Sequence, residues 1–328
     1  MAVGETPAAA RETTRSYYGR PVLKAPVWDW KIPAYLFTGG LSAGSALLGA
    51  GADLTGRPAL RRAGRISALA SLGVSGCLLV ADLGRPERFH HMLRVAKPTS
   101  PMSVGSWILT AYAPGTGVAA MAELVPAGLW SRLPPWVRWG ARAAGLSSAT
   151  VAPAVASYSA VLLSQTAVPA WHEAHRQLPF VFTGSAAAGA GGLGMVCVPV
   201  GEAGPARVLG ATGAVVELVS SRVLERRLGL VREAYRAPRA RRLRASSGIV
   251  TAVGLAGAVL ARRSRVAAIA SGLAMVAGSV LERFAVFEAG VVSTKDPKYV
   301  VEPQRRRLDE TAAVGSPPAS EGGPAPIS

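Results

Sequence analysis

The chain has 328 residues, a mean hydropathy of +0.29 and a formal net charge of +17, and half of its residues are hydrophobic although only 17% are charged. This composition is too apolar for a soluble domain of ordinary type. The arginines lie in short clusters between apolar blocks and form no basic face. We therefore expect them to meet membrane lipids and protein partners, and we expect no nucleic-acid binding.

Apolar blocks of roughly 18 to 25 residues recur along the chain, which is the length a helix needs to cross about 30 Å of hydrocarbon. Residues 1–27 are predicted to form a mobile basic N-terminal tail, 28–294 a transmembrane helical domain, and 295–328 a C-terminal tail that is largely disordered at its end. Within the domain, eight spans are predicted at 32–54, 66–83, 103–126, 145–169, 179–199, 206–223, 247–261 and 265–287. The sequence thus predicts an all-α, polytopic membrane protein with about eight transmembrane helices.

Two cysteines, Cys77 and Cys197, each lie inside an apolar block and form no C-x-x-C motif. We therefore expect no iron–sulfur cluster, no metal site and no structural disulfide in this protein. The glycine-rich runs at 39–44 and 184–189 also lie inside apolar blocks, and no strand is predicted before them. Close helix packing is the better interpretation of these runs than a phosphate-binding loop.

An even number of spans places both termini on one side of the membrane. The loops on that side carry about twice as many lysines and arginines as the other loops, which predicts a multi-pass plasma-membrane protein with cytoplasmic termini. All four histidines, His90, His91, His172 and His175, fall in loops on this side. The opposite face has Asp53 and Glu123 near helix ends and no histidine, so we expect no comparable site there.

The same alternation of spans, in which each helix crosses back to the other side, places a set of polar side chains on the membrane face where both termini lie. A quinone headgroup needs hydrogen-bonding groups at its two carbonyls, a nearby group that exchanges protons, and an apolar slot for its tail. Side chains of this kind at the ends of small-residue helices fit these needs. The candidates for quinone binding and proton exchange on this face are Asp29, Lys31, Tyr35, Asp82, Arg85, His90, Ser103, Gln165 and His172.

Each candidate also has a purely structural explanation. Tyr35 could belong to the belt of aromatic residues at the membrane interface, and His90 could be a solvated loop residue. Asp82 could form a helix-end salt bridge with Arg85 or Arg88. Deeper ionisable residues are costly to keep in a membrane, so they are possible proton-carrying or pairing groups; Glu282 could pair with Arg283 or Arg222. The set of such intramembrane candidates is Glu123, Glu217, Glu282 and Arg283.

Several segments resemble the NrfD/PsrC family, the membrane subunits of polysulfide-reductase-type complexes. They are WKIPAYLFTGGL at 30–41, DLGRPERF at 82–89, SPMS at 100–103, ERF at 282–284 and DPKY at 296–299, and the resemblance runs from about residue 28 to 304. It implies a subunit whose first four helices form a bundle with the quinone site. Tyr158 on the fourth helix is then a further candidate near the quinone.

The resemblance also implies partners and a function. The protein would be the membrane anchor subunit of a molybdopterin and iron–sulfur oxidoreductase complex, exchanging electrons and protons with menaquinone or ubiquinone. A ferredoxin-like iron–sulfur subunit would lie beside it and connect it to a molybdopterin catalytic subunit. No haem or iron–sulfur cluster is expected in this subunit itself.

Two other functions stay open at this stage. An ion- or solute-translocating membrane subunit without quinone chemistry would show broken helices at matching positions in its two halves, and Pro114, Pro153 and Pro169 do not match in this way. A di-haem cytochrome b anchor would need histidines that face each other within the spans, whereas all four lie in loops or at helix ends.

Overall fold

Eight long helices of 20 to 31 residues dominate the computed structural model, which describes residues 23, 24 and 26–305. The described residues contain no strand. The long helices are α2 (Lys31–Leu54), α3 (Pro58–Asp82), α4 (Pro101–Leu124), α6 (Pro135–Ser164), α8 (Leu178–Cys197), α9 (Gly204–Arg227), α11 (Pro238–Leu260) and α12 (Arg265–Lys295). The predicted tails lie largely outside the described residues.

Short helices make the connections at both ends of the bundle. They are η2 (Pro86–Leu93), α5 (Ala127–Trp130), α7 (Pro169–His172), η3 (Gly229–Val231) and α10 (Arg232–Tyr235). Proline occupies the first or second position of most of the long helices, where its missing N–H costs nothing because that group has no partner within the helix. Ser100 caps α4 by accepting a hydrogen bond from the backbone N–H of Ser103.

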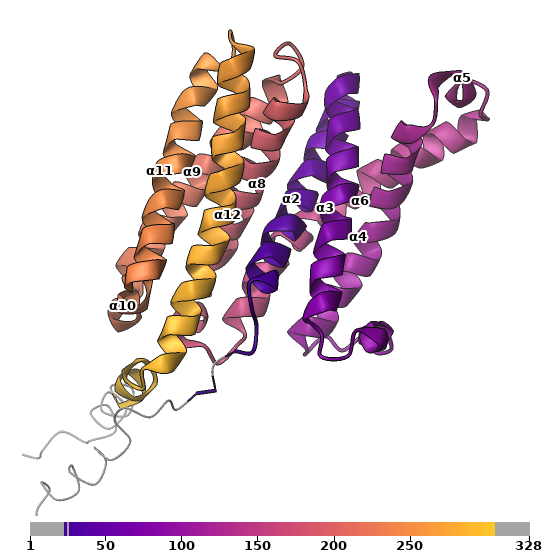
Figure 1. The fold of residues 1–328 in the computed structure, drawn as a ribbon. Coiled ribbons are helices and arrows are strands. Elements are labelled where there is room, and N and C mark those ends of the chain that lie inside the picture. The colour runs from indigo at the N-terminus through magenta and orange to yellow at the C-terminus, as the bar shows by residue number, and fades with distance from the viewer. Residues whose placement is uncertain (1–22, 25, 306–328) are drawn as a thin grey trace, which may run out of the picture.

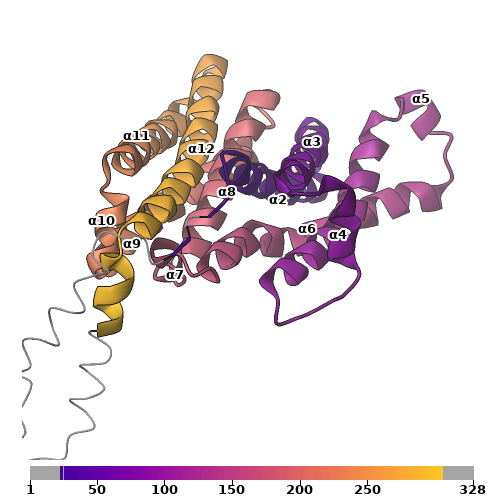
Figure 2. The same ribbon diagram turned by 60° about the horizontal axis from the view of Figure 1, so that its bottom comes forward.

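The long helices form two groups that meet where α2 and α6 pack against α8 (Figure 1). One group contains α2, α3, α4 and α6, and the other contains α8, α9, α11 and α12; α2 also packs against α8 and α12. The start of α2 and the end of α12 lie at the same end of the bundle, which we call the terminal end, while α5 lies at the opposite end (Figures 1 and 2). The side-by-side placement that parity predicted for the helix ends is therefore present.

All eight predicted spans correspond to long helices, and five of these helices, α3, α6, α8, α11 and α12, are long and apolar enough by composition to cross a membrane. The other three pack within the same bundle. Several boundaries differ from the prediction: the second helix begins at Pro58 and the eighth ends at Lys295, each eight residues beyond the predicted bound. The fourth helix begins at Pro135 and ends at Ser164, and the seventh begins at Pro238, nine residues before the predicted start. Hydropathy marks only the apolar part of a helix, whereas its hydrogen bonds continue through arginine-rich turns that water or headgroups can solvate.

Glycines in the two predicted runs lie where helices approach closely. A Cβ added at Gly44 would lie 2.6 Å from the Cβ of Ala190 in α8, and one at Gly184 would lie 2.6 Å from the backbone nitrogen of Glu217 in α9. Only a residue without a side chain permits these approaches. The packing interpretation of both runs is confirmed.

Candidate functional site

A cavity of about 360 Å³ opens at the terminal end, among the first four long helices, and we call it the terminal cavity. Its walls come from α2, α3, α4 and α6, from the segment before α2, and from the connection between α3 and α4. Most of the lining is apolar. The residues that line it are Val27, Trp28, Ile32, Tyr35, Leu79, Asp82, Leu83, Gly84, Met92, Met102, Gly105, Ser106, Leu109, Tyr158, Leu162 and Leu163.

Two tyrosines face this cavity with different hydrogen-bonding states. The Tyr158 hydroxyl donates a hydrogen bond to the backbone carbonyl of Pro101 at 2.6 Å. The Tyr35 side chain is only 7% exposed, and its hydroxyl has no hydrogen-bond partner in the described part of the protein. The hydroxyl oxygen is not among the fully buried unpartnered atoms, so it remains accessible from the cavity and is suited to bind a ligand atom there.

Asp82 is the acidic residue of the lining. It ends α3, and it forms no ion pair within 4.0 Å and no hydrogen bond with any described residue. The alternative of a salt bridge with Arg85 or Arg88 is therefore wrong. Both arginines are exposed and follow the extended turn after α3, which directs the backbone into η2. The Asp82 carboxylate is available to a ligand or to water.

Two packing features place the walls of the terminal cavity. A Cβ added at Gly105 in α4 would collide with the Tyr158 ring, so the glycine makes room for this tyrosine. Trp28 stacks on Trp171 with ring centroids 5.8 Å apart, and the Trp171 indole donates a hydrogen bond to the carbonyl of Val286 at 2.8 Å. The segment before α2 is thus fixed to α12 through a fully buried tryptophan.

A much smaller void of about 10 Å³ adjoins the terminal cavity and shares Tyr35, Leu109 and Tyr158 with it. This void also reaches Gly39 and Gly40 in the middle of α2. The cavity therefore narrows toward the centre of the bundle.

Other candidates lie near the terminal end without lining the cavity. Asp29 pairs with Lys31 at 2.7 Å, and this hydrogen bond holds the pKa of the exposed Asp29 carboxyl below its usual value. The Ser103 hydroxyl donates to the carbonyl of Val95 at 2.8 Å and accepts from the backbone N–H of Lys97 at 2.9 Å, so it fixes the loop before α4.

The histidines and Gln165 also lie outside the cavity lining. His90 is exposed on η2, where its ring contacts that of His91 with centroids 4.4 Å apart. His172 places its Nδ1 3.0 Å from the carbonyl oxygen of Ser164, and Gln165 is the exposed C-cap of α6. Parity brings these residues to the terminal end, but the structure brings only Tyr35, Asp82 and Tyr158 of the predicted set together around the cavity.

Three of the predicted intramembrane groups form a separate buried cluster between the second-half helices. Glu217 accepts a hydrogen bond from the Thr251 hydroxyl at 3.1 Å, and Glu282 accepts one from the Ser221 hydroxyl at 2.9 Å. Arg283 donates to the carbonyl of Phe182 at 2.8 Å and lies over its ring. No ion pair within 4.0 Å joins Glu282 to Arg283 or to Arg222, so the predicted direct pairing is not formed among the described residues.

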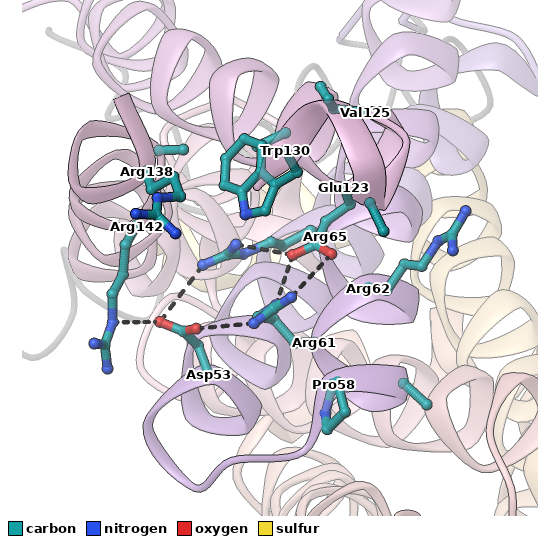
Figure 3. A pocket seen from close by; sticks show the side chains of 14 residues that line it. Asp53, Pro58, Arg61, Arg62, Arg65, Glu123, Val125, Trp130, Arg138 and Arg142 are labelled. Carbon is teal, nitrogen blue, oxygen red and sulfur yellow. Dashed lines mark hydrogen bonds and ion pairs between the residues drawn. The ribbon is translucent and has the colours of Figure 1, made fainter. Parts of the chain in front are cut away.

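The fourth intramembrane candidate, Glu123, lies at the opposite end in a pocket of about 700 Å³, which we call the arginine pocket (Figure 3). Its Oε1 atom accepts from Arg61 at 2.7 Å and from Arg65 at 2.9 Å. Asp53 in turn pairs with Arg142 at 2.8 Å. The expectation that no comparable site forms on this face is wrong, because helix ends far apart in sequence bring these scattered charges together.

Sequence reasoning missed Gly105 and most of the apolar lining of the terminal cavity. Met92 precedes the SPMS segment and Met102 lies within it, but nothing in their spacing shows that they line a cavity. No group of three histidine, cysteine, aspartate or glutamate residues within the described ranges could hold a metal ion, and Cys77 and Cys197 are both free thiols.

The bundle and its cavity define an all-α polytopic membrane protein with a mostly apolar, ligand-sized chamber at one membrane face. The sequence matches the family described as Polysulphide reductase, NrfD, over residues 21–202, which is more than half of its length. The protein belongs to this NrfD family. It is also similar to the C subunit of the polysulfide reductase of Wolinella succinogenes, with 34% identity over 94 residues that cover 27% of the present sequence and 30% of that relative.

Proposed function

We propose that the protein is a quinone-reactive membrane anchor subunit of an oxidoreductase complex, and that the terminal cavity binds the quinone headgroup. The observation that carries this proposal is an apolar cavity of about 360 Å³ that has the unpartnered hydroxyl of Tyr35 and the unpaired carboxylate of Asp82 in one lining. A volume of this size accommodates a small organic ligand. Family membership supports the same assignment.

In this proposal, different lining residues bind the headgroup and exchange protons with it. Tyr35 donates a hydrogen bond to one carbonyl oxygen of the headgroup, and the Tyr158 hydroxyl lies close enough to the same space to fix its orientation. Asp82, at the mouth of the cavity, exchanges protons between the bound headgroup and water as the quinone is oxidised or reduced. Apolar side chains such as Met102, Leu109 and Leu162 contact the ring and the isoprenoid tail.

The partners follow from the position of the cavity. We propose that a ferredoxin-like iron–sulfur subunit covers the terminal end and relays electrons between the quinone and a molybdopterin catalytic subunit. The exposed η2 segment, which contains His90 and follows Arg85, lies beside the cavity and offers a polar docking surface for that subunit. The positive charge of the terminal-end loops favours the cytoplasmic side of the plasma membrane for this assembly.

The proposal is tested on the intact complex by following menaquinol or ubiquinol oxidation, or the reverse reaction, in Tyr35→Phe and Asp82→Asn variants. Tyr35→Phe keeps the ring and removes the hydroxyl, so we expect kcat/KM to fall by about tenfold to a hundredfold, the value of one lost hydrogen bond to a ligand in a desolvated site. Asp82→Asn keeps the shape of the side chain and removes proton exchange, so we expect a fall mainly in kcat of at least about tenfold. Asp82→Glu, which keeps a carboxylate, should restore part of the lost kcat.

A matched control is Tyr112→Phe. Tyr112 lies in the same four-helix group, is fully buried and shares a 2.9 Å hydrogen bond with Ser42, but it does not line the terminal cavity. We expect its turnover to stay within about twofold of the parent value. If Tyr35→Phe and Asp82→Asn assemble and behave like this control, the quinone site lies elsewhere.

A further inference from the structure

The arginine pocket lies where α2 ends, α3 begins, α4 ends and α6 begins, at the end of the bundle away from the terminal cavity (Figure 3). It is about twice the volume of that cavity. Its lining contains five arginines and two carboxylates, an excess of three positive charges. The charged residues of the lining are Asp53, Arg61, Arg62, Arg65, Glu123, Arg138 and Arg142.

The two carboxylates are already fully engaged. Their side chains are each 8% exposed, and three arginines surround them: Arg61 contacts both, Arg65 contacts both, and Arg142 contacts Asp53. Figure 3 shows these contacts as one connected network. An acid that already pairs with two or three guanidinium groups does not neutralise further cations in the pocket.

Two arginines of the lining remain without a carboxylate. Arg62 and Arg138 are exposed, and neither forms an ion pair or a hydrogen bond with any residue that the structure describes. They lie on either side of the network in Figure 3. Deeper in the wall, Arg65 is 8% exposed; its Nε atom has no hydrogen-bond acceptor within the described ranges, and its Nη2 atom has only the Asp53 carboxylate at 3.6 Å, beyond hydrogen-bond distance. The pocket therefore offers more donors than its own acceptors use, which favours an anionic ligand.

The rim of the arginine pocket has the character of a membrane interface. Trp130 lines the pocket, and the guanidinium carbon of Arg142 lies 5.8 Å from the centroid of the Trp139 ring. Trp136 and Trp139 on α6 are 74% and 66% exposed, and Leu129 on α5 is 54% exposed; these three lie near the lining residues in sequence but do not line the pocket themselves. Tryptophans cluster where headgroups meet hydrocarbon, and exposed apolar side chains beside a basic pocket suit acyl chains.

We propose that the arginine pocket binds the headgroup of an anionic phospholipid, with phosphatidylglycerol as the defining example. The net positive charge of the lining, with Arg62 and Arg138 on its two sides, attracts the phosphodiester, and Trp130 in the lining contacts the upper part of the acyl chains. The shared chemistry would also admit free phosphate. We assign the lipid because a cluster of arginines at the end of a membrane bundle attracts anionic headgroups and because exposed tryptophans lie near the pocket.

The test uses the full-length protein, purified in detergent and stripped of lipid, and measures its thermal unfolding midpoint during titration with three probes. These are dioctanoyl phosphatidylglycerol, dioctanoyl phosphatidylcholine and inorganic phosphate. We expect phosphatidylglycerol to raise the midpoint by about 5 °C at saturation, as a ligand does when it binds only the folded state. We expect the other two probes to leave it unchanged.

The variant that tests the residues is Arg62→Gln with Arg138→Gln, and its matched control is Arg132→Gln with Arg263→Gln. Both pairs remove two charges from exposed arginines at the same end of the bundle, but Arg132 and Arg263 do not line the pocket. The half-saturating concentration of phosphatidylglycerol should rise at least about tenfold in the first pair, through loss of charge-assisted hydrogen bonds, and less than about twofold in the control.

Three results would overturn the proposal. If phosphatidylcholine raises the unfolding midpoint as much as phosphatidylglycerol does, the pocket does not recognise the charge of the headgroup. Equal protection by inorganic phosphate would mean that the pocket takes a free anion and not a lipid. Equal weakening in both variant pairs would mean a diffuse charge effect without a site. None of these results bears on the quinone proposal, because the readout is lipid binding at the other end of the bundle.

Discussion

The terminal cavity and the arginine pocket lie between the same four helices, yet their linings differ in nearly every property. The cavity at the terminal end is mostly apolar, with one unpartnered tyrosine hydroxyl and one unpaired carboxylate among the residues that the structure describes. The pocket at the opposite end carries seven charged residues in and around an ion-pair network. The first suits a neutral ring that is recognised by a few hydrogen bonds, and the second suits an anion that is recognised by charge.

The difference arises from how the helices are joined at each end. At the opposite end, α2 and α3 are joined by a short turn, so arginines on the first turns of α3 are held beside the C-terminal acidic residues of α2 and α4. At the terminal end, the longer connection through η2 spreads away from the bundle and leaves space between α3 and α4. The longer connection between α3 and α4 therefore contributes to the apolar space at the terminal end.

The largest expected effect that separates the two ends is that of Gly105→Leu. A side chain at this position meets the Tyr158 ring and must either displace it or fill the terminal cavity. We expect quinone-linked turnover of the intact complex to fall at least about a hundredfold, since a displaced positioning group can cost this much. Binding of phosphatidylglycerol at the other end should stay unchanged.

The matched control for this change is Gly117→Leu on the same helix, where an added Cβ has no neighbour within 4 Å. Assembly of the complex, followed by size-exclusion chromatography, is measured for both variants. Normal turnover in an assembled Gly105→Leu variant would show that the cavity is not used in the reaction.

Arg65→Met should have the next largest effect, and it should act on stability and not on turnover. Removing this 8% exposed guanidinium leaves Glu123 and Asp53 with fewer partners in a desolvated site. Breaking a buried pair of this kind costs about 3–5 kcal/mol. We expect that loss in the free energy of unfolding, measured by chemical denaturation of the purified protein in detergent.

Arg263→Met serves as the control for this stability change. Arg263 is exposed at the same end, so its substitution should lower the free energy of unfolding by less than about 0.5 kcal/mol. At temperatures where Arg65→Met remains folded, its quinone turnover should equal that of the parent. A matching loss of turnover would mean that the two ends are coupled.

Tyr158→Phe should have an intermediate effect confined to the terminal end. The change removes the 2.6 Å hydrogen bond to the carbonyl of Pro101 but keeps the ring that walls the cavity. We expect a loss of about 1 kcal/mol in stability and a rise of a few fold in KM for the quinone, with kcat nearly unchanged. Steady-state kinetics over a range of quinol concentrations separates the two parameters, and a collapse of kcat would assign this tyrosine a direct role.

Gln165→Ala should have the smallest effect. Gln165 lies at the terminal end but is exposed at the C-cap of α6 and does not line the cavity. We expect turnover within about twofold of the parent. A larger loss would mean that the site extends beyond the cavity to the histidine-bearing loops, as the sequence pattern indicated.

The sequence by itself determined the class of fold. Apolar blocks of membrane-spanning length, small residues within them, and basic clusters between them predict a helical bundle, because each helix must satisfy its backbone hydrogen bonds internally within hydrocarbon. The same pattern predicts which helix ends lie at the same face, because successive spans cross the membrane in alternating directions. The sequence pattern accordingly identifies Tyr35 and Asp82 as candidates, and the family resemblance identifies Tyr158.

Only the tertiary structure decided which residues of that face meet. His90, His172 and Gln165 share the side of the membrane with Tyr35, but side-chain direction and loop path keep them out of the cavity lining. The arginine pocket was not predicted at all, because its acids and arginines are up to 89 residues apart in the sequence and become neighbours only when α2, α3, α4 and α6 pack. Hydropathy and parity record how far a residue lies along a helix axis, whereas a site also depends on rotation about that axis, and helix packing sets that rotation.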